Sequence, residues 1–174
     1  KSTGKHLIVD KLSEEKSPEG IVFISKIPQF KDRDYNKIIY LDRLRDPGNL
    51  GTIIRTALGL GIDAIYVSKE SVSTFNNKTL AAAKGAIFEI PIFIKEVEEV
   101  KQLKDKGYQI ISTSLKGKTI SLDEFKVKKP FVCIFGNETH GIRDELLKIS
   151  DICLKIPIEK IDSFNVAVSA GIIM

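Results

Sequence analysis

One arginine stands out among the residues that could do chemistry, because nothing on its own segment neutralises it. Arg55 follows the turn residues Asp46-Pro47-Gly48-Asn49, and Asn49 is placed there to cap a helix that ends near Gly59 or Gly61. The positions three and four residues away on either side of Arg55 are glycine, threonine or leucine. No carboxylate on the same helix can therefore pair with this guanidinium.

The residues around Arg55 divide between two faces when the segment is projected as a helix. The apolar half holds Ile53, Ile54, Ala57, Leu58 and Leu60, and the other half holds Gly51, Thr52, Arg55, Thr56 and Gly59. We expect the glycines and threonines to leave an open face beside Arg55, which suits the close approach of an anion. An ordinary amphipathic helix with one surface arginine explains the same pattern.

Two further loops place polar residues after apolar, strand-like runs. Glu138 lies between Gly136 and Gly141, so its carboxylate belongs to a tight turn with exposed backbone. Capping of a helix near Arg143 by Asn137 or Glu138 explains this loop equally.

The other loop leads into the last helical segment. Ser163 is a natural N-cap there, and Asn165 follows two residues later. Plain capping is again the alternative to a role in a site.

Composition bounds the class of protein. The chain has 174 residues, is 43% hydrophobic and carries a net charge of +4, which allows one good core and is compatible with a polyanionic partner. No apolar run is long enough to span a membrane, and no cysteine–histidine cluster suggests a metal. Cys133 and Cys153 lie in apolar runs, which favours buried free thiols. We expect a soluble protein of the reducing cytoplasm, without metal.

From residue 37 onward, short apolar runs alternate with helical patterns. The strand-like runs are Ile38–Leu41, Ala64–Val67, Tyr108–Ser112, Phe131–Phe135 and Ile152–Ile156. The helical patterns cover about 50–59, 77–84, 95–106, 143–149 and 163 to the end. Strands that are apolar throughout are buried on both faces, so the fold class is α/β, with a mostly parallel sheet and helices on both faces. Loops at the carboxyl ends of such strands are where ligands bind.

The first part of the chain has a different character. Residues 1–30 contain two short strand-like runs and are too few to fold alone, so we interpret them as the tail of a preceding domain. Residues 31–36 are a polar linker, and residues 37–174 form the main domain with an incomplete last helix. Both ends look cut, which suggests a piece of a longer protein.

Three stretches together resemble the motifs of a known family. Leu41-Asp42, Asp46-Pro47-Gly48-Asn49-Leu50-Gly51 and Arg55-Thr56-Ala57 together resemble motif 1 of the SpoU (TrmH-type) RNA 2′-O-ribose methyltransferases of the SPOUT superfamily. Phe135-Gly136-Asn137-Glu138 with Gly141-Ile142 resembles motif 2, and Ile156-Pro157-Ile158 with the run Ser163–Gly171 resembles motif 3. Phe164, where leucine is usual, and Ile158, where methionine is common, are departures that remove no polar group.

The resemblance implies more than the residue patterns do. It implies a deep C-terminal trefoil knot that holds S-adenosyl-L-methionine, an obligate homodimer, and an RNA substrate, with rRNA favoured and tRNA possible. Residues 17–22 also resemble the end of an L30e-like RNA-binding domain. The residue patterns alone predict an unknotted sheet, because threaded chains are rare.

The resemblance also implies roles for individual residues. The catalytic set is Asn49, Arg55, Glu138, Ser163 and Asn165, and the cofactor-binding set is Thr113, Ser114, Leu115, Gly117, Gly136, Asn137, Ile156, Ile158, Phe164 and Asn165. The family's arginine is often assigned as the general base. Because a guanidinium is not deprotonated in proteins, we expect Arg55 instead to orient a phosphate and stabilise a developing alkoxide.

Two other classes of function remain open at this point. A catalytically silent, knotted RNA-binding module in ribosome assembly would bind S-adenosylmethionine without turnover. A nucleotide-binding enzyme of the Rossmann type is the second, since residues 59–64 match its glycine fingerprint. That stretch closes a helix and leads into a strand, which is the reverse of the order the fingerprint requires.

Overall fold

A computed structural model describes residues 25–114, 119–128 and 130–174. Within these residues, seven strands form one parallel sheet in the order β3-β2-β1-β6-β4-β7-β5. The strands are β1 (Lys37–Leu41), β2 (Ala64–Val67), β3 (Ile92–Ile94), β4 (Gln109–Thr113), β5 (Ile120–Ser121), β6 (Phe131–Phe135) and β7 (Ile152–Lys155). The α/β class and the parallel sheet are confirmed, and β3 and β5 are additions to the five predicted strands.

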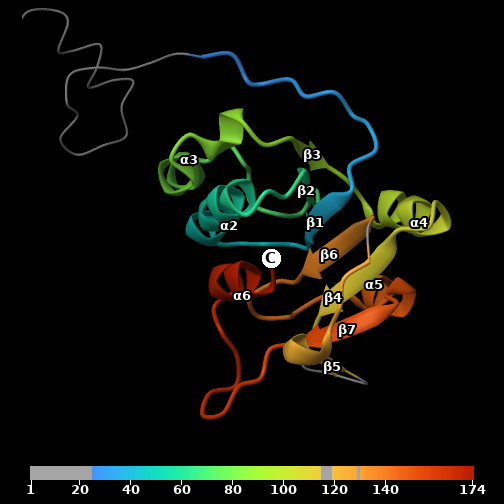
Figure 1. Cartoon of the computed structure of the whole chain (residues 1–174). Coiled ribbons are helices and arrows are strands. Elements are labelled where there is room, and N and C mark those ends of the chain that lie inside the picture. The colour runs from blue at the N-terminus through green and yellow to red at the C-terminus, as the bar shows by residue number, and fades with distance from the viewer. Residues whose placement is uncertain (1–24, 115–118, 129) are drawn as a thin grey trace, which may run out of the picture.

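Helices cover both faces of this sheet (Figure 1). They are α2 (Pro47–Gly59), α3 (Asn77–Ala83), α4 (Val97–Asp105), α5 (Asp144–Ile149) and α6 (Val166–Ile173), with short 3-10 turns at Ala86–Phe88 and Leu122–Glu124. Helix α2 packs against α3 and α6 on one face, whereas α4 and α5 pack on the other. None of the helices in the described part of the chain is long and apolar enough to cross a membrane.

The side chains of β1 show why the strands are apolar throughout. Ile39 and Leu41 belong to the core beneath α2 and α6, whereas Ile38 and Tyr40 belong to the core beneath α4 and α5. All four are fully buried, because successive strand residues point to opposite faces and both faces are covered. Burying each such side chain contributes on the order of 1.5–3 kcal/mol.

Strand β6 has a position that chain order does not suggest. It pairs with β1 on one side and with β4 on the other, and β4 pairs with β7. The carboxyl ends of β6, β4 and β7 are therefore neighbours in the sheet. The loop after β1 lies beside the turn after β6 for the same reason.

Only one of the two cysteines is fully buried. Cys133, in β6, has its pKa raised to about 12 by burial, so it is an unreactive thiol under ordinary conditions. Cys153, in β7, is only partly buried. The expectation of two buried thiols is therefore wrong for Cys153, because β7 lies nearer the edge of the sheet than β6.

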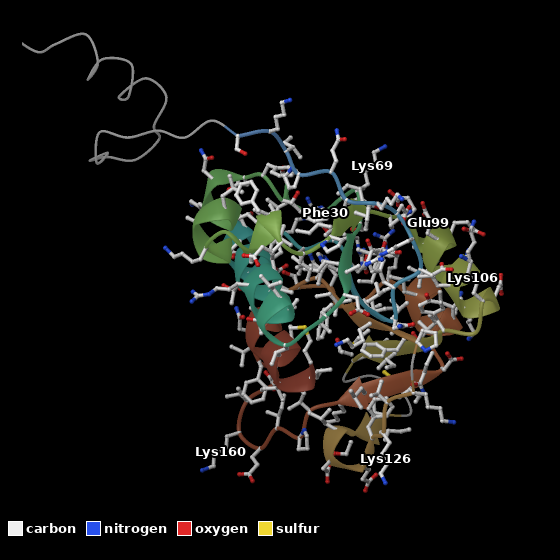
Figure 2. The ribbon with its side chains drawn as sticks, turned by 45° about the horizontal axis from the view of Figure 1, so that its top comes forward. Phe30, Lys69, Glu99, Lys106, Lys126 and Lys160 are labelled. Carbon is white, nitrogen blue, oxygen red and sulfur yellow. The ribbon has the colours of Figure 1, made fainter. Side chains whose placement is uncertain are left out.

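Residues before β1 contact the folded domain. Tyr35 is buried and lies against Phe93, with ring centroids 6.0 Å apart. Asp32 pairs with Lys95 at 2.6 Å, and Asp34 pairs at 3.0 Å with Lys106, which directly follows α4. Lys106 projects from the outer side of the molecule (Figure 2). These contacts hold the end of the predicted linker against the β3–α4 part of the domain. The predicted strands in residues 1–24 lie outside the described residues.

Candidate functional site

Helix α2 begins earlier than its apolar pattern predicts. Asp46 is the N-cap, and its Oδ1 accepts a hydrogen bond of 2.7 Å from the backbone N–H of Asn49, with Pro47 in the first helical turn. The prediction that Asn49 caps this helix is wrong. The carboxylate of Asp46, directly before Pro47, accepts the hydrogen bond from the backbone N–H of Asn49 and so caps the helix. The side chain of Asn49 is consequently available for contacts across the site.

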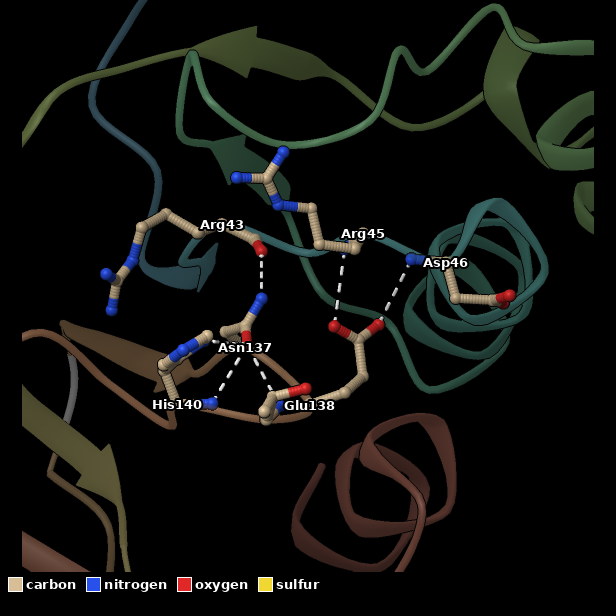
Figure 3. A pocket seen from close by; sticks show the side chains of 7 residues that line it. Arg43, Arg45, Asp46, Asn137, Glu138 and His140 are labelled. Carbon is tan, nitrogen blue, oxygen red and sulfur yellow. Dashed lines mark hydrogen bonds between the residues drawn. The ribbon is translucent and has the colours of Figure 1, made fainter.

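Glu138 reaches from the turn after β6 to the loop after β1. Its carboxylate accepts hydrogen bonds from the backbone N–H groups of Arg45, at 3.3 Å, and Asp46, at 3.2 Å, as Figure 3 shows. It also accepts one of 3.2 Å from Nδ2 of Asn49. Capping of the following helix by Glu138 or Asn137 is wrong, because α5 has Arg143 at its N-cap and no side-chain cap bond.

Asn165 extends this network to the last helix. Its Nδ2 donates to Oδ1 of Asn49 at 2.9 Å, while its own Oδ1 accepts from the first N–H groups of α6. Asn165 is therefore the N-cap, and the prediction of Ser163 as the cap is wrong. Ser163 lies exposed two residues earlier. Glu138, Asn49 and Asn165 form a continuous chain that joins three segments distant in sequence.

Arg55 stands apart from that chain of hydrogen bonds. Its side chain is exposed and makes no hydrogen bond or ion pair to any residue within the described ranges. The expected open face beside it is only partly right. Gly51 is buried, and an added Cβ there would lie 2.4 Å from the carbonyl oxygen of Thr79. Gly51 is thus needed for the close approach of α3, and the exposed surface at Arg55 begins with Thr52.

The turn after β6 is closed by backbone contacts. A Cβ on Gly136 would lie 2.4 Å from backbone atoms of both Gly141 and Ile142, and Gly141 has a φ of 70°. Asn137 pairs with Gly141 through both backbone groups, at 3.0 and 2.9 Å. The two glycines therefore let the turn fold back on itself.

The side chain of Asn137 holds this turn against the loop after β1. Its Nδ2 donates to the carbonyl of Arg43 at 2.7 Å, and its Oδ1 accepts from the N–H groups of Thr139 and His140, both at 2.9 Å. Both polar atoms of its amide thus form hydrogen bonds within the protein, and any contact of Asn137 with a cofactor would use other atoms.

The remaining predicted cofactor residues lie on loops that follow adjacent strands. Thr113 ends β4, and its hydroxyl donates to the carbonyl of Ile134 at 2.9 Å. Ser114 continues the β4–β7 pairing through its backbone N–H. Ile156, Ile158 and Phe164 are half-buried in the segment after β7. Leu115 and Gly117 lie outside the described residues.

An ion network around one buried carboxylate supports the site, and the sequence did not predict its pairing. Asp42 is fully buried directly after β1 and accepts bonds from Arg143, at 2.7 Å to Nε and 2.9 Å to the backbone N–H. Arg143 also forms two bonds with Glu70, at 3.3 and 3.1 Å. The sequence indicated Asp42 only as part of the resemblance to motif 1, which does not reveal its partner.

This network shifts the ionisation of its members. The hydrogen bond from Arg143 holds the pKa of Glu70 below its ordinary value. Burial disfavours the charged form of Arg143, but hydrogen bonds to Glu70 and Asp42 outweigh it, so the pKa of Arg143 lies above its ordinary value. Glu70 and Arg143 therefore stay charged at neutral pH, and Arg143 ties the loop after β1 to the start of α5.

An open cavity of about 410 Å³ lies where these loops meet. It is lined by Arg43, Arg45, Asp46, Asn137, Glu138, Thr139 and His140 (Figure 3). It includes two predicted site residues, Asn137 and Glu138. It lies between the loop after β1 and the turn after β6, and among the described residues it shares only that turn with the predicted cofactor site. Among the described residues, no group of three histidine, cysteine or acidic side chains could hold a metal ion.

Sequence comparison then defines the class of protein. Residues 36–174 match the SpoU rRNA Methylase family, so the chain belongs to that family. It is 34% identical over 165 residues to the 23S rRNA (guanosine(2553)-2′-O)-methyltransferase RlmP of Bacillus subtilis, an alignment that covers 94% of this chain and 66% of that protein.

Solved structures agree with this assignment. An AdoMet-bound rRNA methyltransferase from Sinorhizobium meliloti is 35% identical with a TM-score of 0.73, covering 78% of this chain and 53% of the other. A TrmH-family protein from Porphyromonas gingivalis, at 24% identity, shows the same fold with a TM-score of 0.82 over 95% of this chain and 68% of the other. The chain thus spans between about half and about two-thirds of the length of these relatives.

Proposed function

We propose that this chain is the catalytic part of an S-adenosylmethionine-dependent methyltransferase that modifies a ribose 2′-hydroxyl of RNA. The observation that carries the proposal is the chain of hydrogen bonds Glu138–Asn49–Asn165, which joins the three motif-bearing loops at the carboxyl edge of the sheet. The substrate class is rRNA, as for the relative from Bacillus subtilis, with tRNA as the second possibility.

The residues present fit S-adenosylmethionine. Ile156, Ile158 and Phe164 are half-buried apolar side chains in the segment after β7, the neighbour of β4 in the sheet, which suits an adenine ring. Thr113 and Gly136 would offer backbone groups at the same edge, as expected for ligands of parallel sheets. Bound S-adenosylmethionine supplies an electrophilic methyl group for transfer to the ribose oxygen.

The residues of the protein position the site and bind the RNA, and each has a separate role. Glu138 and Asn49 hold the loop after β1, and Asn165 orients the start of α6 beside them. Arg55 is exposed and free of internal partners among the described residues, so its guanidinium can bind a phosphate of the RNA. In that position it stabilises the negative charge that develops on the ribose oxygen as the proton leaves.

Several finer features belong to the same proposal. A trefoil knot involving the segment between β7 and α6 is supported by the insertion of β6 between β1 and β4 and by the return of α6 to α2. An N-terminal L30e-like domain before residue 31 would select the RNA. A cytoplasmic homodimer, with α6 in its interface, is the expected assembly.

Two measurements test the proposed function. Isothermal titration of S-adenosylmethionine into the full-length protein tests the cofactor site. Transfer of tritiated methyl groups to total RNA from a strain that lacks the gene tests the reaction. We expect binding, with label recovered on ribose 2′-oxygens. Binding of S-adenosylmethionine without label on RNA would favour a silent RNA-binding module. No binding would overturn the assignment of the S-adenosylmethionine site.

A further inference from the structure

The cavity between the loop after β1 and the turn after β6 has three lining residues that the proposed reaction does not use. Arg43 and Arg45 come from the first loop, and His140 comes from the second. These two segments are far apart in sequence and are brought together by the β1–β6 pairing. Figure 3 shows His140 on the turn that faces the loop of Arg43 and Arg45, whose guanidinium groups extend from that loop in different directions.

The carboxylates of this lining are occupied by other groups. Glu138 accepts from the backbone of Arg45 and Asp46 and from Asn49. Asp46 accepts from the backbone of Asn49 as the cap of α2, and its carboxylate points away from Arg43 and His140 in Figure 3. Among the described residues, neither carboxylate therefore forms an ion pair with Arg43 or Arg45.

The two arginines keep donors available for a ligand. The side chain of Arg45 is exposed and forms no ion pair or hydrogen bond with the residues that the structure describes. Arg43 makes longer bonds, of 3.2 to 3.4 Å, to Asp42 and to the carbonyl of Gly141. Asp42 already has a shorter bond of 2.7 Å from Arg143. A guanidinium carries five donors, so Arg43 retains some for a bound anion.

His140 is oriented by the turn. The Nδ2 of Asn137 donates to the carbonyl of Arg43, which fixes its Oδ1 as the atom facing His140 at 3.2 Å from Nδ1. An acceptor at that position requires a proton on Nδ1. In the neutral ring the other nitrogen, Nε2, is then an acceptor, so this exposed side chain can meet a phosphate only through a donor between them, such as a bridging water.

We propose that this cavity binds a backbone phosphate of the RNA strand, next to the nucleotide that is methylated, with Arg45 and Arg43 as donors and His140 beside them. Planar guanidinium groups suit phosphate oxygens, and phosphate contacts set the register of a nucleic acid on its protein. The proposal rests on the proposed function, since it assigns part of the RNA path at the same site.

The test uses a 5′-fluorescein-labelled oligouridylate of about 20 nucleotides, because phosphate contacts do not depend on sequence. Its dissociation constant is measured by fluorescence anisotropy at several salt concentrations, for the full-length wild type, Arg45→Gln, Arg45→Lys and His140→Ala. Lys148→Gln removes an exposed cation from α5 and is the matched control. S-Adenosylmethionine affinity is measured for each variant.

We expect Arg45→Gln to weaken oligouridylate binding about tenfold and to lower the salt slope by about 0.7. Arg45→Lys should restore the slope, His140→Ala should weaken binding less, and the control should match wild type. Unchanged RNA binding and slope in Arg45→Gln would overturn the phosphate site while leaving the methyltransferase proposal intact. Loss of S-adenosylmethionine affinity in Arg45→Gln would overturn it too, by assigning the cavity to the cofactor. A wild type that binds neither probe would overturn the proposed function itself.

Discussion

Glu138 is the residue on which the arrangement of the site depends most directly. It is exposed, yet its carboxylate satisfies two backbone N–H groups at the start of α2 and the amide of Asn49. A hydrogen bond to a charged group contributes on the order of 1.5–3 kcal/mol. Such bonds position Asn49 and the loop before it, so Glu138 acts through other residues.

Replacing Glu138 by glutamine tests this positioning role. The substitution removes the charge and turns one acceptor oxygen into a donor that faces other donors. We expect methyl transfer to RNA to fall about tenfold or more, in line with the loss of one such bond. Titration should show S-adenosylmethionine binding close to wild type. Glu145→Gln, on α5, is the control, and equal losses in both variants would contradict the assignment.

The second prediction for a single residue concerns Arg55. If its charge orients a phosphate and stabilises the alkoxide, Arg55→Ala should lower kcat about 100-fold or more. Arg55→Lys keeps the charge but loses the bidentate geometry, so it should retain measurable turnover at high RNA concentration. Single-turnover methyl transfer at saturating RNA distinguishes the two variants. Complete and equal loss in both would argue against a role based on charge.

At the scale of elements, the contact between α2 and α3 depends on a glycine, because a side chain at that position would collide with α3. A Cβ on Gly51 would meet the carbonyl of Thr79 at 2.4 Å and the side chain of Ala82 at 2.6 Å. Gly51→Ala should therefore destabilise the protein by about 1–3 kcal/mol through overpacking. Gly59, at the other end of α2, has nothing within 4 Å. Gly59→Ala should instead raise stability by about 0.5–1 kcal/mol. Urea unfolding of both variants checks the opposite signs.

The ion network between the loop after β1 and α5 makes stability depend on pH. The pKa of Glu70 is lowered below 4.5 in the folded protein by its hydrogen bond to Arg143. Its contribution is therefore present above pH 4.5 and is lost as the pH falls through the lowered pKa. Because Glu70 is half-exposed, the contribution is small, about 0.5 kcal/mol.

Melting temperatures of wild type and Glu70→Gln between pH 3 and pH 7 test this dependence. The variant should melt about 1–2 °C lower at pH 7, and the difference should vanish toward pH 3. Glu89→Gln, at an exposed position, is the control. A difference that grows as the pH falls would show that the sign is wrong.

The sequence predicts best the elements that depend on residues close together in the chain, and it predicts poorly those that depend on distant segments. The five longer strands were predicted to within one residue at each end, because their apolar runs are local features. Strand β3 was missed because it has three residues, one of them exposed. The position of β6 between β1 and β4 depends on pairing between distant segments, which no local pattern encodes.

The same reasoning applies to the candidate site. Its polar residues were predicted by their resemblance to family motifs, but their partners were not. Asn49 was assigned to a cap because Asp46 was not recognised as the better one. Gly51 was placed on an open face because a helical projection does not show where α3 packs. The partners of Asp42 lie far along the chain, so only the folded structure brings them together.

At the scale of the whole molecule, α6 presents apolar side chains to solvent. Val168 and Ile172 are one helical turn apart and are 50% and 44% exposed, while Ala167 and Ala170 face the core. In the proposed homodimer this exposed face is part of the subunit interface. A two-fold interface uses the same patch twice, so one substitution alters both copies.

Val168→Glu should therefore separate the subunits. A carboxylate placed in an apolar interface loses its hydration without gaining a partner, and two such groups would meet near the two-fold axis. Sedimentation velocity should show a dimer for the wild type and a monomer for Val168→Glu, with methyl transfer lost in parallel. Phe88→Glu changes a side chain that is 52% exposed outside α6, and it should leave the dimer intact. A wild-type monomer, or a dimer that survives Val168→Glu, would mean that α6 covers no subunit interface.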